Sequence, residues 1–101
     1  MSQHARVRWL VTYDIADPRR LSRMFRALKK EGIPIQYSVF YVCASQQQMG
    51  SLMARLAHLI HPRQDDVRAY RIPEKPLQIT LGRSILPEDT LQDPSNPFLI
   101  T

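Results

Sequence analysis

One stretch constrains this chain more than any other: a β-prone run that ends in an acid and leads at once into a helix signal. Residues 7–15 are rich in β-branched and aromatic side chains and contain no Gly or Pro, which predicts a buried strand. Asp14 is the first acid of this run. Because burying an unpaired charge is costly, we expect Asp14 to lie at an open edge, either paired or metal-bound.

A basic helix is predicted directly after this strand. Asp17 can cap its N-terminus, and Pro18 suits the first helical position. Gly32 and Pro34 predict that it ends near Lys30. One face is apolar, with helical spacing between Leu21, Met24, Phe25 and Leu28. The opposite face carries what we call the basic stripe, Arg19, Arg23, Arg26 and Lys30, flanked by Arg20 and Lys29. Such a stripe is either a solvated helix face or a binding site for a polyanion, and the sequence leaves both interpretations open.

Length and composition indicate one small domain. With 101 residues, 44% of them hydrophobic, the chain can bury a small core, and a homodimer would add to the buried surface. Its longest apolar run, residues 39–44, is far shorter than the roughly 20 residues of a membrane span. The first residues also lack the apolar core of a signal peptide. We therefore expect a cytoplasmic protein with no membrane partner. Cys43 is the sole cysteine, and we expect a small buried apolar residue there.

Charge is distributed unevenly along the chain. The formal net charge of +5 combines +7 over residues 1–82 (13 basic against 6 acidic side chains) with −2 over residues 83–101. We therefore divide the chain into a basic domain, residues 1–82, and an acidic tail, residues 83–101, with different functional surfaces. The Phe-Leu-Ile segment at residues 98–100 would give that tail an apolar anchor for docking to a protein partner.

The rest of the chain predicts further strands and a second helix. Residues 33–44 are β-prone and fit either one bent strand or two short ones. Ser45 and Gln48 form a capping-box pattern, which opens a helix that continues until His61 and Pro62 end it. Residues 67–72 and 77–81 have strand character. This order predicts an α+β fold, a ferredoxin-like two-layer sandwich with both helices on one face of an antiparallel sheet.

Four short motifs follow one another along the basic domain: Tyr13-Asp14-Ile15, Asp17-Pro-Arg-Arg20, Gly32 followed by Ile35-Gln36-Tyr-Ser38-Val39-Phe40, and Asp66-Val-Arg-Ala-Tyr70. Together they resemble the Cas-two family, the small non-integrase subunit of CRISPR spacer acquisition, over residues 7 to about 82. The resemblance implies a βαββαβ fold, and hence two strands within residues 33–44. It also implies a homodimer in which the last strand, residues 77–81, joins the partner's sheet.

The same resemblance implies two kinds of activity. As scaffolds, dimers of this family bridge two dimers of the Cas-one integrase and hold a DNA duplex. As enzymes, many members are described as magnesium-dependent endonucleases acting on RNA or duplex DNA, and the aspartate that matches Asp14 binds the metal. The alternative is a toxin-like ribonuclease of the VapD kind, which shares the fold.

These interpretations single out a set of candidate site residues. Asp14 is the expected metal ligand and catalytic carboxylate, and two copies of it at a dimer axis would share a Mg²⁺ ion with several waters. Tyr13 and Ser38 are each either catalytic, orienting water or phosphate, or hydrogen-bonded to the backbone. Phe40 is either a core residue or a platform for base stacking. The candidate nucleic-acid contacts are Arg19, Arg20, Arg23, Arg26, Lys30, Arg68 and Arg71.

Overall fold

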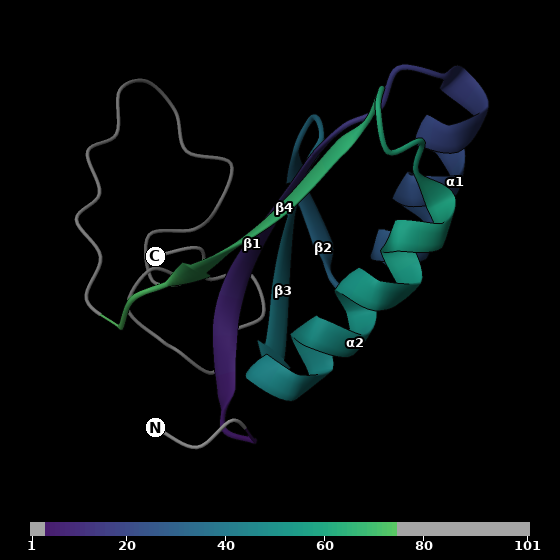
Figure 1. The fold of residues 1–101 in the computed structure, drawn as a ribbon. Helices are drawn as coiled ribbons and strands as arrows, with labels where there is room; N and C mark the ends of the chain where they lie inside the picture. The colour runs from purple at the N-terminus through teal and green to yellow at the C-terminus, as the bar shows by residue number, and fades with distance from the viewer. Residues whose placement is uncertain (1–3, 75–101) are drawn as a thin grey trace.

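A computed structural model of the chain describes residues 4–74. The elements follow the order β1 (Arg6–Asp14), α1 (Pro18–Lys29), β2 (Ile33–Gln36), β3 (Val39–Ser45), α2 (Gln46–Leu56), the 3₁₀ turn η1 (Ala57–Leu59) and β4 (Asp66–Ile72). The four strands form one antiparallel sheet in the order β2-β3-β1-β4 (Figure 1). This confirms the predicted α+β ferredoxin-like βαββαβ fold. The strand predicted at residues 77–81 and the acidic tail lie outside the described residues.

The central strand is β1, which pairs with β3 on one side and β4 on the other. Its side chains alternate between the two faces of the sheet, as a strand requires. Val11, Tyr13 and Ile15 belong to the hydrophobic core, whereas Asp14 is exposed at the end of the strand. The sequence therefore correctly predicted a largely buried strand that ends at an accessible carboxylate.

Both helices cover the same face of the sheet (Figure 1). Their buried residues join one core cluster with Val11 of β1 and Phe40 of β3, and these residues are Met24, Leu28, Met49, Leu52 and Leu56. Phe25, predicted on the apolar face of α1, lies at the margin of that core and remains 38% exposed, with its ring edge-on to Phe40. The two-layer arrangement predicted from the helical patterns is thus confirmed.

The predicted helix starts are also confirmed. The Asp17 carboxylate accepts hydrogen bonds from the backbone N–H groups of Arg19 and Arg20, each at 3.0 Å. At α2, the Ser45 hydroxyl accepts from Gln48 N while the Gln48 side chain accepts from Ser45 N, which is the reciprocal capping box. No helix within residues 4–74 is long and apolar enough to cross a membrane.

One alternative that the sequence left open is resolved by the structure, and two expectations are corrected. Residues 33–44 form two strands, β2 and β3, joined by a turn at Tyr37 and Ser38. The second helix ends at Leu56 and tightens into η1 before His61. Cys43 is half-buried rather than buried, because it alternates with the core residues Val42 and Ala44 and so lies on the face of the sheet away from the helices.

Gly32 is required by a close approach between the end of α1 and β3. A Cβ atom at this position would overlap the carbonyl oxygen of Tyr41 and lie 2.8 Å from Cγ2 of Val42. The obstacle is largely backbone, which cannot swing aside as a flexible side chain can. Gly50, on the exposed side of α2, is different, because a Cβ atom added there would have no neighbouring atom within 4 Å.

We predict opposite effects for alanine at these two glycines. Gly32→Ala should lower the free energy of unfolding by about 3 kcal/mol, because the methyl group forces the α1–β2 connection away from β3. Gly50→Ala should raise it by up to about 1 kcal/mol, because alanine favours an exposed helix interior. Urea denaturation at equal protein concentration measures both values. A neutral Gly32→Ala would contradict the close approach.

Candidate nucleic-acid interface

The basic stripe is a row of exposed cations along α1. Helix α1 turns its buried residues, Met24 and Leu28, toward the core, so the stripe faces away from the sheet. Within residues 4–74, the side chains of the stripe form no ion pair with a carboxylate. At 1.5 Å per residue, the stripe extends roughly 17 Å along the helix. This is an accessible positive surface of the length needed to follow several phosphates.

Arg20 differs from the stripe because it is held by a buried carboxylate. Its Nε lies 2.7 Å from Oδ2 of Asp65, and its Nη2 donates to Oδ1 of Asp65 at 3.2 Å and to Gln64 Oε1 at 3.0 Å. The Asp65 side chain is fully shielded from solvent. Arg20 was predicted to contact nucleic acid, but its guanidinium is already engaged within the fold.

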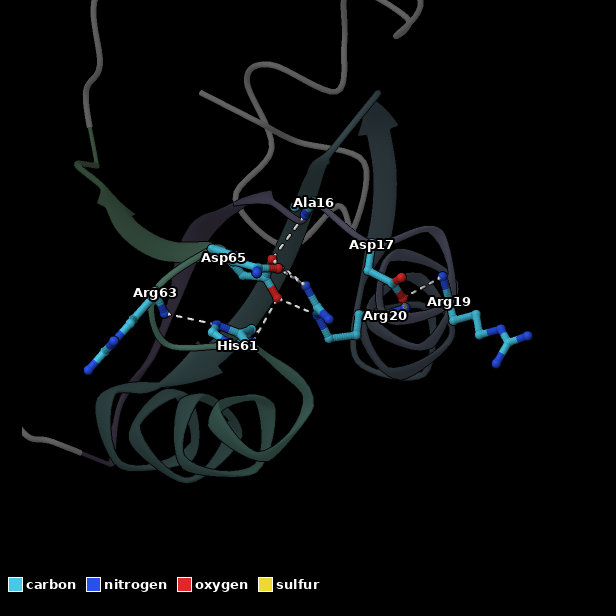
Figure 2. A network of polar contacts seen from close by, with 8 residues as sticks. Ala16, Asp17, Arg19, Arg20, His61, Arg63 and Asp65 are labelled. Atoms are coloured by element: carbon cyan, nitrogen blue, oxygen red, sulfur yellow. Dashed lines mark hydrogen bonds and ion pairs between the residues drawn. The ribbon is translucent and has the colours of Figure 1, made fainter.

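Asp65 is the centre of the network in Figure 2, where it faces Arg20, His61 and Ala16. Besides the Arg20 pair, Oδ1 accepts from Ala16 N at 2.9 Å and Oδ2 accepts from His61 N at 2.8 Å. One carboxylate therefore joins the end of β1, the start of α1 and the loop before β4. These donors, above all Arg20, hold the pKa of Asp65 well below its ordinary value of 3.8. No local sequence pattern indicates this role, since two of the partners lie 45 and 49 residues away.

The carboxyl end of β1 faces a second acid, which no local pattern groups with Asp14. Asp14 lies directly opposite Asp66 in the β1–β4 register. Asp14 has no ion-pair partner within residues 4–74, whereas Asp66 accepts from Arg68 Nε at 2.8 Å. No cluster of three or more His, Cys, Asp or Glu side chains is present in this described part of the chain. A single protomer therefore offers two neighbouring carboxylates.

Tyr13 precedes Asp14 on β1, and its backbone is hydrogen-bonded to Ser38, in the turn between β2 and β3. Tyr13 is 7% exposed and its ring centroid is 6.2 Å from that of Phe40. Burial raises the pKa of Tyr13, with a smaller effect from Tyr37, so its hydroxyl stays protonated at neutral pH. The Ser38 carbonyl accepts from Tyr13 N at 3.1 Å, and Ser38 has a left-handed φ of 61°. Because strand side chains alternate, Tyr13 points to the core while Asp14 points to the opposite face.

The comparisons with known proteins agree on one family. A family model described as CRISPR associated protein Cas2 matches residues 7–79. The chain belongs to the Cas2 family. It is 41% identical over 80 residues to CRISPR-associated endoribonuclease Cas2 1 of Nitrosomonas europaea, covering 79% of this chain and 76% of that protein. It is 44% identical over 77 residues to CRISPR-associated endoribonuclease Cas2 2 of Thermodesulfovibrio yellowstonii, covering 76% and 85% respectively.

Solved structures show the same relationship. The hypothetical protein TT1823 from Thermus thermophilus superposes with a TM-score of 0.73 at 30% identity, covering 83% of this chain and all of that one. Cas2 of Streptococcus pyogenes superposes with a TM-score of 0.61 at 26% identity, covering 66% of this chain and 87% of that one. The fold and family inferred from the four sequence motifs are therefore confirmed.

Within this Cas2-family fold, the two remaining arginine candidates do not share a surface. Arg68 lies opposite Thr12 and on the same face as Asp66, and its Nη1 is 3.5 Å from the Tyr70 hydroxyl. Arg71 lies opposite Trp9, three residues further along β4, and so points to the other face. Phe40 is fully buried, which confirms its interpretation as a core residue.

We predict that Asp65 stabilises the fold in a pH-dependent way. Its pKa is lowered in the folded state, so its contribution is complete above the unfolded pKa and is lost as the pH falls through the folded pKa. Asp65→Asn should lower the melting temperature at pH 7. The difference in melting temperature between this variant and the wild type should shrink below about pH 4. Differential scanning calorimetry between pH 2 and 7 measures this.

Glu31→Gln is the matched control for Asp65→Asn. It also removes a paired carboxylate, but Glu31 and Arg55 are 34% and 64% exposed, so their ion pair contributes little. Equal losses for both variants at pH 7 would contradict a central role for Asp65.

Proposed function

We propose that this chain acts in CRISPR spacer acquisition as a homodimer that binds duplex DNA and bridges two dimers of the Cas-one integrase. The observation that carries the proposal is the basic stripe, whose four cations are exposed and have no carboxylate partner within residues 4–74. Unpaired cations on a rigid helix release counterions when they meet phosphates. Membership of the Cas2 family supports the biological context.

The geometry supports contact with the phosphate backbone rather than reading of bases. The stripe consists of Arg and Lys alone, and it lies along a helix that is packed against the sheet through its other face. Phosphate contacts position a duplex without carrying sequence information. A bridging subunit must accept protospacers of any sequence, which is the property that such a surface provides.

Neutralising the stripe should weaken duplex binding and its dependence on salt. For the dimer, we expect log K to fall with log salt at a slope of roughly −4 to −7. Arg19→Ala, Arg23→Ala and Arg26→Ala combined should flatten that slope, whereas Arg63→Ala, an exposed cation outside the stripe, should change it little. Fluorescence anisotropy gives the slopes, and light scattering on the same sample gives the oligomeric state. A monomer, or an unchanged slope in the triple variant, would contradict the proposal.

A second candidate activity is metal-dependent phosphodiester hydrolysis, which we propose to centre on Asp14. The relatives from Nitrosomonas europaea and Thermodesulfovibrio yellowstonii are both named endoribonucleases. The specific observation in this chain is that the exposed Asp14 carboxylate faces Asp66 across the β1–β4 pair. Arg68 pairs with Asp66 and offsets part of the repulsion between the two carboxylates, so Asp14 is the charge that a bound cation would balance.

The residues present fit a magnesium ion. Mg²⁺ is held by one or two carboxylates and keeps several waters, so Asp14 and Asp66 would be sufficient protein ligands. When bound, the ion would polarise a phosphoryl oxygen and make a nearby water more acidic. The chain itself orients the carboxylates through the β1–β4 register, and Arg68 holds Asp66 through its Nε at 2.8 Å. Tyr13 serves this site by packing β1 onto Phe40.

Asp14→Asn should distinguish the scaffold function, duplex binding and integration, from the enzymatic function, phosphodiester cleavage. The substitution keeps the size of the side chain and removes the charge that magnesium requires, so cleavage of RNA and duplex DNA should be lost. Duplex affinity should be retained or rise, because a negative charge no longer repels phosphate. Paired assays of cleavage, binding and integration with the partner integrase measure this, with Glu74→Gln, an exposed carboxylate that lines neither proposed site, as the control.

Two outcomes of that assay would change the assignment. Loss of integration together with cleavage, at unchanged dimerisation and DNA affinity, would contradict the scaffold as the physiological role. Ribonuclease activity without any stimulation of integration would instead favour a toxin-like ribonuclease of the VapD kind.

A further inference from the structure

The sheet has a notch at one edge because two neighbouring strands differ in length. Strand β3 has seven residues and β2 has four, and their pairing runs only from Gln36 opposite Val39 to Ile33 opposite Tyr41. Beyond Tyr41, the second half of β3 has no β2 partner on that side. The chain arrives there from the end of α1, and helix α2 starts there from the end of β3. The end of α1, β3 and α2 therefore surround a strand edge with which no strand within residues 4–74 pairs.

Two adjoining hollows lie at this edge and share Arg6, Glu31 and Cys43. The hollow beside α2 has a volume of about 400 Å³, and the one beside the end of α1 has a volume of about 300 Å³. These volumes are at the lower end of the range for ligand pockets. We call the combined feature the Arg6 notch, and its charged and reactive residues are Arg6, Lys29, Lys30, Glu31, Cys43 and Arg55.

The Arg6 notch is positively charged. Four cations from three different elements line it, against the single carboxylate of Glu31 among its described residues. That carboxylate is already paired with Arg55 at 3.2 Å. Cations brought together from separate elements in a concave site attract anions more strongly than the same charges on a flat surface, because the low-dielectric walls focus the field.

Arg6 is pre-oriented within the notch. Its Nη2 donates a 2.8 Å hydrogen bond to the Cys43 carbonyl, on the edge that β2 leaves uncovered. This contact fixes the guanidinium plane, and the side chain remains exposed. An arginine held in this way loses less conformational entropy when a phosphate binds to its remaining N–H groups.

Lys30 connects the notch to the basic stripe, because it is the last member of the stripe and also lines the hollow beside α1. We propose that the Arg6 notch is a binding site for the phosphodiester backbone of a nucleic acid strand that continues past the end of the stripe. This inference rests on the proposed DNA-binding function and adds a second contact site to it, on the far side of Lys30.

An acidic extended peptide is the other class of polyanion that could use this edge. Such a peptide would have to pair with the uncovered edge of β3, as in strand addition. The Cys43 carbonyl there already accepts from Arg6, so an added strand would compete with the Arg6 side chain for that acceptor and for the space beside it. A phosphate needs no backbone pairing, and the continuity with the stripe favours it.

Cys43 provides a local reporter for this proposal, because it is the sole cysteine of the chain and lines both hollows. The rate of Cys43 alkylation by N-ethylmaleimide, an uncharged reagent, is measured on the full chain with and without a saturating DNA duplex. Anisotropy on the same samples confirms that the duplex is bound. We expect alkylation to be several-fold slower in the complex. An unchanged alkylation rate when the duplex is bound would overturn the proposed binding site. So would a Cys43 thiol that does not react even without DNA.

Substitutions at Arg6 provide an independent measurement. Arg6→Ala should reduce the salt slope of duplex binding by about 1 per protomer and weaken the protection of Cys43, whereas Arg6→Lys should retain the slope because it keeps the charge. Arg63→Ala is the control, since it removes an exposed cation that lines neither hollow. Equal slopes for Arg6→Ala and Arg63→Ala would overturn the proposal.

The experiment separates this inference from the proposed function. If the chain binds no duplex at all, both the proposed function and the proposed binding site in the Arg6 notch are wrong. If duplex binds through the stripe but leaves Cys43 reactive, only the proposed binding site in the Arg6 notch is wrong. Polyglutamate at the same charge concentration tests the alternative, and protection by polyglutamate without protection by duplex would assign the notch to an acidic protein and overturn the proposal.

Discussion

The position of helix α1 depends on one buried carboxylate, that of Asp65. Four hydrogen bonds to it come from Ala16, Arg20 and His61, and they join the end of β1, the first turn of α1 and the loop before β4. A buried charge is tolerated when all its lone pairs are occupied in this way, and it is costly when a partner is removed. The basic stripe and the exposed Asp14 lie on the two elements that this carboxylate holds together.

Several cations within residues 4–74 are held by partners in the fold, whereas those of the basic stripe are not. Arg20 is bound to Asp65, and Arg8 is 8% exposed and donates to the carbonyls of Pro73 and Glu74. The stripe cations have no carboxylate partner within residues 4–74. A net charge of +5 does not distinguish held from unpaired cations, although only unpaired cations gain by releasing counterions from phosphate. The positive surface available to a duplex is therefore smaller and more localised than composition indicates.

The alternation of side chains along the strands separates residues that are neighbours in sequence. Tyr13 packs into the core while Asp14 faces the other way, and Arg68 and Arg71 point to opposite faces of β4. Conversely, pairing between β1 and β4 places Asp66 opposite Asp14, although 52 positions separate them in the numbering. A short motif thus supplies residues to different surfaces, and the proposed pair of carboxylates comes from distant parts of the chain.

The sequence by itself determined the elements, the helix caps, the core faces and the family, because each of these is carried by local spacing or by motifs within a few residues. It also placed Asp14 at an accessible strand end. The tertiary structure alone decided that Arg20 is committed to Asp65, that Asp66 faces Asp14, and that Arg6 lies at a notch in the sheet edge. These contacts join residues 37 to 52 positions apart, and their formation depends on strand register and strand length, which no local pattern encodes.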